Sequence, residues 1–356
     1  MQILPSGTPG ATTTSSTATA TIHRATTASP AATSPATATP ARSLPDISTV
    51  KRSPRFASFR RTWQLYAMLA LPMLWLVIFQ YIPMWGVQIA FRDYKARGGF
   101  AGLWSAEWIG LDNFDRFFNS YNFWPILQNT LVLNVYSLVA GFPLPIVLAL
   151  ALNYVTRIWF KKTVQMVSYA PHFISTVVIV GMILQLLSLN GIFNQFLGIF
   201  GIDPIAFMSK PEYFKSIYVW SGVWQSVGFS CIIYLAALAG IDPSLHEAAI
   251  LDGANKLQRM RDIDLPGILP VAAILLILNM GTLLSSGFEK IILMQNPLNI
   301  SASEVIDTYV YNVGLASQVP QFSYATAIGL FKSVIGLILL LSVNWIARRF
   351  RAASLF

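Results

Sequence analysis

The sequence predicts an all-helical membrane protein that crosses the bilayer six times, and three observations support this fold class. First, 54% of the residues are hydrophobic and only 11% are charged, a balance that lies outside the range of soluble globular domains. Second, six apolar runs are long enough to cross a hydrocarbon core of about 30 Å, which takes about 20 helical residues. Third, these six runs contain a single formally charged residue, Lys332.

The six predicted spans lie at residues 64–86, 126–152, 164–187, 216–240, 266–286 and 323–346. The first resembles a secretory signal in its hydrophobicity, but it is long, lies deep in the chain and precedes no small-residue cleavage site. It is therefore predicted to remain as the first membrane helix. Cys231, the sole cysteine, falls inside the fourth span and is expected to serve in packing, without an internal disulfide.

Basic residues between the spans predict the sidedness of the chain, because Lys and Arg near helix ends are retained on the cytoplasmic side. They gather before span one, between spans two and three, between spans four and five, and after span six. The opposite connections are longer and hold fewer bases, so both termini are predicted to be cytoplasmic. The net charge of +9 follows from this distribution, whereas a nucleic-acid-binding protein would gather its bases on one face.

Residues 1–50 are predicted to be a disordered cytoplasmic tail, and residues 51–356 to form the membrane domain. Ala, Thr, Ser and Pro dominate residues 1–45, which have too little apolar bulk to offset the entropy lost on ordering. The composition also resembles an organelle transit peptide, and this interpretation stays open.

Two outer connections are long. Residues 87–125 are rich in aromatic side chains and are expected to fold along the membrane surface. Residues 287–322 exceed the length of a tight helical connection and contain chain-bending signals. Long connections on one side indicate a partner there, and six spans without an internal repeat are typical of one half of a pore.

A charged stretch between spans four and five is predicted to form a short helix outside the membrane, at residues 244–252. Ser244 and Glu247 have the spacing of a capping box. Gly253 permits the left-handed geometry that ends a helix. The small side chains of Ala248 and Ala249 would let a partner approach the backbone, with Glu247 and Asp252 as charges at the rim. A short interfacial helix without a partner would show a similar pattern.

The same stretch holds no metal site, and the chain is not predicted to be an enzyme. His246 and Glu247 begin like a zinc-protease helix, but Ile250 stands where the second histidine would be needed. The chain contains no Gly-Lys pair, so it lacks the phosphate-binding loop of an ATPase. No cofactor is therefore expected on this chain.

Residues 247–266 read EAAILDGANKLQRMRDIDLP. The Glu-Ala-Ala start, Gly253, Ile263 and the Leu265-Pro266 pair resemble the cytoplasmic coupling motif of permease subunits in type I ABC importers. In that family the motif docks onto a separate ATPase, so the resemblance implies that ATP with Mg²⁺ is bound by a partner chain. The resemblance assigns this role to Glu247, Ala248, Ala249, Asp252 and Gly253.

The resemblance extends over roughly residues 60–350. Segments similar to permeases for oligosaccharide and polysaccharide uptake are FQYIPMWGVQIAFRDY at 79–94 and WIGLDNF at 108–114. Segments that look like the branch importing alginate-type or pectin-derived oligosaccharides are QNP at 295–297, VIDTYVYNVGL at 305–315 and YATAIGLFKSV at 324–334. They specify the substrate less strongly than the coupling motif specifies the superfamily.

The resemblance implies a multi-pass subunit of a bacterial inner membrane that moves oligosaccharides or polysaccharide by ATP-driven alternating access. Its implied partners are a second homologous permease, two ATPase subunits, an extracytoplasmic solute-binding protein and the lipid bilayer; no nucleic acid is implied. A neutral sugar or another small solute stays open as cargo. From other classes, an ATP-independent membrane channel or a membrane-embedded enzyme is the alternative, but neither needs the 247–266 pattern.

Polar side chains inside a span are costly unless they face a cavity or a partner, so they are candidates for a substrate pathway. Four such residues are predicted to lie about 10–14 Å below the outer surface at 1.5 Å per residue: Asn134, Gln225, Asn279 and Lys332. Three aromatic side chains just above this layer would stack on sugar rings: Trp220, Trp224 and Tyr324. For the amides, interhelical hydrogen bonds worth about 0.6 kcal/mol each are an equally good explanation.

Lys332 is the sharpest of these candidates, because a charge at this depth costs about 2.5 kcal/mol or more. No acid within the predicted spans neutralises it. It is expected either to face an aqueous cavity and attract a uronate carboxylate, or to contact helix carbonyls, or to meet an acid of the partner permease.

Overall fold

The computed structural model describes residues 55–285 and 287–349 and divides the chain into two units, Met1–Tyr66 and Ala67–Phe356. Helices make up the architecture, and the β pairing within the described residues is one isolated bridge between Arg92 and Trp108. The all-helical prediction is confirmed. The predicted tail at residues 1–50 lies outside the described residues.

The first predicted span is a continuous helical stretch, Thr62–Phe91, long and apolar enough to cross a membrane. The stretch begins within α1 (Arg55–Leu76). It continues through η2 (Val77–Tyr81), α2 (Ile82–Met84) and η3 (Trp85–Phe91). The segments η2 and α2 have no buried residue. Since these side chains are apolar, lipid or another chain must cover them.

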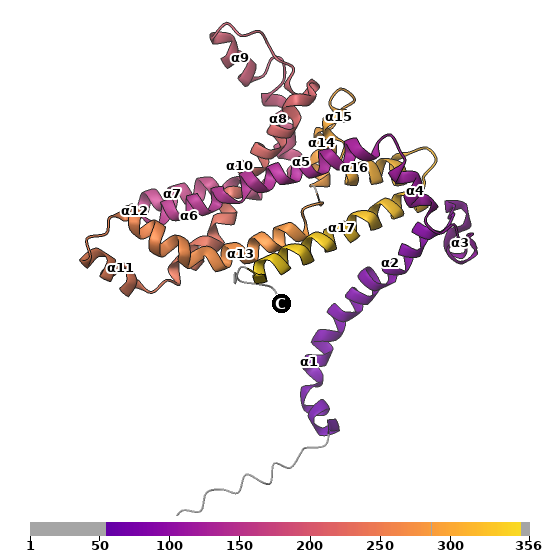
Figure 1. The fold of residues 1–356 in the computed structure, drawn as a ribbon, viewed down its shortest axis with the longest axis horizontal. Helices are drawn as coiled ribbons and strands as arrows, with labels where there is room; N and C mark the ends of the chain where they lie inside the picture. Colours follow the sequence, from indigo (N-terminus) through magenta and orange to yellow (C-terminus); the bar gives the residue numbers. More distant parts are fainter. Residues whose placement is uncertain (1–54, 286, 350–356) are drawn as a thin grey trace, which may run out of the picture. The chain divides into compact units, whose positions relative to one another are not determined.

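Four further stretches are long and apolar enough to span a membrane. They are formed by α5 (Phe123–Gly141) with α6 (Pro143–Asn153), by α10 (Pro211–Ala239), by α13 (Leu265–Gly281) with the short helices before it, and by α17 (Phe322–Arg349). Figure 1 shows α10 beside α5 and α6, and α13 beside α17. Helix α10 also contacts α13, so it is the central helix of this group.

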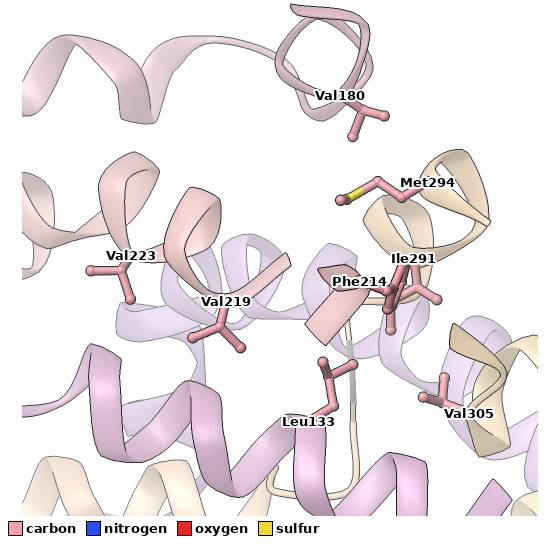
Figure 2. Packing of buried hydrophobic residues seen from close by; sticks show 8 residues of the cluster. All are labelled: Leu133, Val180, Phe214, Val219, Val223, Ile291, Met294 and Val305. Atoms are coloured by element: carbon pink, nitrogen blue, oxygen red, sulfur yellow. The ribbon is translucent and has the colours of Figure 1, made fainter. Parts of the chain in front are cut away.

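Three apolar clusters hold these helices together. Figure 2 shows the first, which joins α5, α10 and outer segments through Leu133, Val180, Phe214, Val219, Val223, Ile291, Met294 and Val305. The second joins α6, α10 and α13 and includes Cys231, which is fully buried. The expected packing role of this cysteine is confirmed. The third is aromatic and lies between α4 (Asp112–Phe118), the start of α5 and α17.

The third predicted span is not one straight helix. Residues Ile158–Phe173 and Thr176–Leu186 are bent by 100° relative to each other, so the structure has five candidate spans, or six if this pair counts as one. The pieces are α7 (Ile158–Tyr169), η5 (Ala170–Phe173) and α8 (Thr176–Leu186). Pro171 cannot continue the helical hydrogen bonding, and the Ser175 hydroxyl accepts from the Val178 amide to start a new helix. The predicted span 164–187 thus contains a break between Phe173 and Thr176, which its apolar composition did not indicate.

The outer connections contain short helices. Residues 87–125 hold η4 (Ala96–Gly98), α3 (Gly99–Ser105) and α4, and α4 packs against α17. Between α8 and α10 lie α9 (Ile192–Ile199) and η6 (Phe207–Ser209). Residues 287–322 hold α14 (Phe288–Met294), α15 (Ile300–Ser303), α16 (Ile306–Tyr311) and η8 (Asn312–Ala316). Helix α16 packs against both α5 and α17, so a segment expected outside the spans reaches the polar side chains within them.

The charged stretch between α10 and α13 forms three short elements: α11 (Pro243–Leu251), α12 (Lys256–Arg259) and η7 (Met260–Asp264). Figure 1 shows α11 and α12 at one end of the long helices and α14 to α16 toward the other. Helix α11, which is predicted to be cytoplasmic, therefore lies at the opposite end of the long helices from α14 to α16, which belong to a predicted outer connection. Sidedness itself stays a prediction.

Candidate functional site

The predicted helix outside the spans is present as α11, but its cap differs from the expected one. Asp242 caps the helix: its Oδ1 accepts a hydrogen bond from the Ser244 amide at 2.9 Å, and Pro243 occupies the first turn. Ser244 lies inside the helix, so the capping box with Glu247 was wrongly predicted. The hydrogen bonds from the Ser244 backbone and hydroxyl hold the pKa of Asp242 below its ordinary value.

The end of α11 follows the prediction. Gly253 has φ +80°, the left-handed geometry that favours glycine. The Ala254 amide donates to the Ala249 carbonyl at 2.8 Å, and the Gly253 amide donates to the Ile250 carbonyl at 3.0 Å. This pair of bonds forms a Schellman motif, which satisfies carbonyls at the end of the helix. The space around Gly253 is open, since a methyl group there would meet no atom of the described chain within 4 Å.

The surface of α11 is available to a partner, because the helix has no buried residue. Glu247, Ala248, Asp252 and Gly253 are exposed and Ala249 is half-buried. Exposed apolar side chains, which sequence reasoning did not single out, accompany them. They are Leu245, Ile250, Leu251 and Leu257, and Leu251 is 88% exposed. The signal for them was available, because apolar residues in a charged connection outside the spans need a cover.

A buried carboxylate lies beneath α11. Asp264, at the end of η7, is fully buried, and its Oδ2 accepts a hydrogen bond from Tyr154 Oη at 2.6 Å. The Nε2 atom of His246 on α11 lies 3.3 Å from Asp264 Oδ1, and the Arg259 guanidinium lies 5.8 Å from the centre of the Tyr154 ring. Burial and the Asp264 carboxylate raise the pKa of Tyr154 to about 12, so the phenol stays a hydrogen-bond donor. Sequence reasoning missed this group, whose one signal was an acid directly before an apolar span.

Two of the predicted pathway residues, Asn134 and Asn279, line the same cavity of about 500 Å³ between α5, α10 and α13. Hydroxyl groups share this lining, from Ser137, Ser226, Ser230, Thr282 and Ser285. Its aromatic members are Phe142, Phe229 and Tyr234. The cavity therefore offers amides and hydroxyls beside aromatic faces, which suits a ligand with many hydroxyls and flat C–H faces.

The structure places Gln225 differently. Its Nε2 donates to the Ile174 carbonyl at 3.3 Å, at the break between η5 and α8. A break in a span leaves backbone groups without helical partners, and a membrane interior has no water to satisfy them. The amide of Gln225 supplies one such partner, which agrees with the structural explanation of this residue.

None of the three predicted stacking aromatics is among the described residues that line the cavity. Trp220 Nε1 donates to Tyr136 Oη at 2.9 Å and lines a separate apolar pocket, and Trp224 is about half exposed. Tyr324 is 4% exposed within the aromatic cluster, and the Arg116 guanidinium lies 4.4 Å from the centre of its ring. The structure therefore does not bring these rings together around Asn134 and Asn279.

Lys332 has an acidic partner in its own chain. Its Nζ donates to Asp307 Oδ1 as an ion pair, and the two side chains are 18% and 21% exposed. Asp307 belongs to α16, which the sequence placed in the outer connection, outside the spans. Both residues line a pocket of about 340 Å³ together with Ser285 and Ser333. Ser285 also lines the larger cavity, so the ion pair lies next to the candidate pathway.

Comparison with known proteins agrees with these features. Residues 141–352 match the family described as binding-protein-dependent transport system inner membrane component. The polygalacturonan/rhamnogalacturonan transport system permease protein YteP of Bacillus subtilis (strain 168) is 43% identical over 82% of this chain and 90% of its own length. Protein LplB of the same organism is 39% identical over 88% of this chain and 97% of its own length.

Solved structures show the same fold. A chain of a bacterial ABC transporter involved in the import of the acidic polysaccharide alginate is 40% identical, with a TM-score of 0.76. It covers 83% of this chain and 98% of its own. A second structure, the alginate ABC transporter in complex with alginate pentasaccharide-bound periplasmic protein, is 39% identical with a TM-score of 0.76 and covers 84% and 99%.

Proposed function

This chain belongs to the binding-protein-dependent transport system inner membrane component family, and from that premise we propose that it conducts uronate-containing oligosaccharides through an ABC importer. As a transport permease it supplies a path across the inner membrane. The observation that carries the proposal is the cavity lined by Asn134, Asn279 and several hydroxyls between α5, α10 and α13. Relatives named for polygalacturonan, rhamnogalacturonan and alginate transport supply the substrate class.

The lining chemistry fits a sugar. Amide groups donate and accept hydrogen bonds, and hydroxyls rotate to suit either role. A chain of sugar rings sliding through a pore needs many weak and exchangeable contacts, since a tight site would hold it. Because the described residues do not enclose the cavity, we propose that a second permease subunit closes it and supplies the other half of the path.

The ion pair beside the cavity suits an acidic cargo. Lys332 is balanced by Asp307, so the cation is stable at this depth. A uronate carboxylate that reaches the pocket lined by Lys332, Asp307 and Ser285 would compete with Asp307 for the ammonium group. Lys332 is thus proposed to attract the substrate carboxylate, which would replace the Asp307 carboxylate as the partner of the ammonium group.

Helix α11 is proposed to be the docking element for an ATPase chain. Its support is the exposed set Glu247, Ala248, Asp252 and Gly253, the half-buried Ala249 and the apolar side chains beside them. Small side chains allow close approach, and an exposed apolar face gains free energy when it is covered. In the full machine two ATPase subunits, which carry ATP and Mg²⁺, would close on nucleotide and displace α11.

The outer side is proposed to receive a sugar-loaded binding protein. The related alginate transporter has been seen with such a periplasmic protein. Its docking would favour opening of the cavity toward the outside, while ATP-driven movement of α11 would open it toward the cytoplasm. The cavity would thus open first to one side of the membrane and then to the other, which is alternating access.

The test is ATP hydrolysis by the assembled complex in lipid nanodiscs, stimulated by its binding protein loaded with a panel of oligosaccharides. The panel contains oligogalacturonate, oligo-alginate, their carboxyl-reduced neutral counterparts and a short peptide. The proposal expects stimulation by the acidic sugars and much weaker stimulation by the reduced ones. Equal stimulation by the neutral sugars would support the neutral-sugar alternative, and a lack of stimulation by every sugar of the panel would contradict the importer proposal.

A further inference from the structure

Helix α11 is tied to the helical bundle by one of its own side chains. His246 is half-buried, with 24% of its side chain exposed, although α11 has no buried residue. Its imidazole points toward Asp264, with Nε2 3.3 Å from Oδ1. The helix that presents its other side chains to a partner thus makes a specific polar contact on its inner side.

Asp264, the partner of His246 in this contact, is a buried carboxylate that needs polar groups around it. The carboxylate is fully buried, and Oδ2 is satisfied by the Tyr154 hydroxyl at 2.6 Å. Within the described residues, Oδ1 is buried and has no hydrogen bond, and the His246 imidazole lies beside it with Nε2 at 3.3 Å. A buried carboxylate that loses a partner is strongly destabilised, so Asp264 resists separation from either His246 or Tyr154.

The three residues belong to three different elements. Tyr154 directly follows α6 at the end of the candidate span Phe123–Asn153, and Asp264 ends η7, directly before α13, within the candidate span Lys256–Gly281. Tyr154 and Asp264 are 110 residues apart in the chain. The backbone connects α11 with α10 and, through α12 and η7, with α13. It offers no short path to α6, so a displacement of α11 reaches α6 through non-covalent contacts.

We propose that Asp264 is a positioning residue for energy coupling: the link His246–Asp264–Tyr154 passes movement of α11 to the ends of α6 and α13. This inference rests on the proposed docking of an ATPase on α11 and goes beyond it. Docking requires the outer surface of the helix, whereas transmission requires this inner contact. Pro145 on α6 and Asn279 on α13 both line the candidate sugar cavity, so the link connects the docking surface to the path.

The two functions can be separated by mutation. Tyr154→Phe removes one hydroxyl from the link, and His246→Ala removes the imidazole, while both leave the exposed surface of α11 intact. His246→Gln keeps an N–H donor of similar reach. Asp262→Asn is the matched control, because Asp262 is two residues from Asp264 but 65% exposed, with Arg261 Nε at 3.7 Å.

The experiment uses the complete complex in nanodiscs, with its binding protein loaded with oligogalacturonate. Three quantities are measured: the amount of ATPase chain that copurifies, basal ATP hydrolysis, and maximal stimulation by the loaded binding protein. For Tyr154→Phe and His246→Ala we expect normal copurification and basal hydrolysis, with stimulation reduced between about twofold and thirtyfold. The binding-protein concentration for half-maximal stimulation should stay unchanged. His246→Gln should restore much of the stimulation, and Asp262→Asn should resemble the unmodified chain.

The outcomes distinguish the inference from the proposal beneath it. Normal stimulation in assembled complexes of both Tyr154→Phe and His246→Ala would overturn the inference and leave ATPase docking intact. An equal loss in Asp262→Asn would also overturn it. Asp264→Asn changes the central carboxylate of the link itself and should also reduce stimulation. If this variant fails to assemble, Tyr154→Phe still decides, since it removes a single oxygen atom. A complex in which the unmodified chain recruits no ATPase would defeat the docking proposal, and the inference with it.

Discussion

Lys332 on α17 and Asp307 on α16 form an ion pair between residues that are 25 positions apart in the chain. The pair joins a candidate span to a segment that the sequence placed in the outer connection. It also places an acid and a base in the pocket next to the candidate sugar cavity. Its contribution to stability and its contribution to transport can be tested separately.

Loss of one partner of this pair is expected to destabilise the protein. Asp307→Asn leaves the partly buried ammonium of Lys332 without its counter-charge, and breaking such a pair costs about 3 kcal/mol. The double change Asp307→Asn with Lys332→Met should cost less than Asp307→Asn alone. Unfolding midpoints in detergent measure both. The control is Asp93→Asn, because the Lys95–Asp93 pair is 79% and 52% exposed and such surface pairs contribute about 1 kcal/mol or less. Equal losses in both pairs would contradict the expectation.

Lys332→Met is also expected to change substrate choice. If the ammonium group attracts a uronate carboxylate, uptake of oligogalacturonate should fall more than uptake of the same oligosaccharide with its carboxyl groups reduced. Uptake into proteoliposomes that contain the complete transporter measures both, with the amount of inserted complex as the reference. An equal loss for acidic and neutral sugars would sink the carboxylate role and leave a purely structural one.

Two amides predicted in the same layer are expected to respond differently. Asn279→Leu should reduce sugar-stimulated transport with little change in stability, because the side chain is exposed and lines the cavity. Gln225→Leu should instead lower stability by about 1 kcal/mol, because it leaves the Ile174 carbonyl at the helix break without its donor. Unfolding midpoints and uptake rates are measured for both variants. If Gln225→Leu reduced transport and Asn279→Leu reduced stability instead, the substrate pathway would pass Gln225 and not Asn279.

Gly253 is expected to matter through its backbone geometry and through the space beside it. Gly253→Ala forces a side chain into φ +80°, which costs about 1 kcal/mol and should weaken ATPase recruitment about fivefold. Gly253→Arg should abolish recruitment, because it also fills the open space beside α11. Gly198→Ala is the control, since Gly198 also has no neighbour within 4 Å but does not have a positive φ. Pull-down of the ATPase chain gives the answer, and normal recruitment by Gly253→Arg would remove α11 as the docking element.

Lys290 on α14 gives an expected pH dependence. Burial lowers the pKa of its ammonium group from 10.5 to about 8, and its Nζ donates to the Tyr218 carbonyl at 3.1 Å. Below pH 8 the folded protein therefore holds a buried charge, at a cost of about 3 kcal/mol. Between pH 8 and 10.5 the unfolded chain binds more protons than the folded one, so this contribution to stability rises with pH.

The expected result is that Lys290→Met unfolds at a higher temperature than the unmodified chain at pH 7, with a difference that narrows toward pH 10. Lys210→Met is the control, because Lys210 also lies over a tyrosine ring, at 5.9 Å from its centre, but is exposed. The pH dependence of the Lys290→Met difference is compared with that of Lys210→Met. A difference for Lys290→Met that does not change from pH 7 to pH 10 would contradict the assigned cause.

Local patterns predicted much of the fold. An apolar run long enough to cross a membrane identifies itself without reference to the rest of the chain, which is why spans such as 216–240 and 323–346 coincide closely with α10 and α17. The left-handed end of α11 at Gly253 was likewise predicted from a local signal. The start of α11 was missed by one residue, because Asp242 and Ser244 are both good caps and Pro243 between them favours the first.

Predictions that depended on the surroundings of a side chain were less successful. Asn134 and Asn279 do share a cavity, but Gln225, predicted at the same depth, serves the break after Phe173. Tyr324 lies in a packed aromatic cluster, although its position along the chain favoured a sugar contact. Depth along a helix follows from counting residues, whereas the direction of a side chain depends on which helix packs beside it.

The sequence by itself determined the helical class, the apolar segments and the coupling motif, because hydrophobicity and turn chemistry act between residues close in the chain. The tertiary structure alone decided which side chains lie beside the buried charges. It brought Asp307 to Lys332, and it brought His246 and Tyr154 to Asp264 from separate elements. The physical reason is that a charge in a poorly solvated interior must find a partner within a few ångströms. Which residue provides that partner is settled only when distant helices pack together.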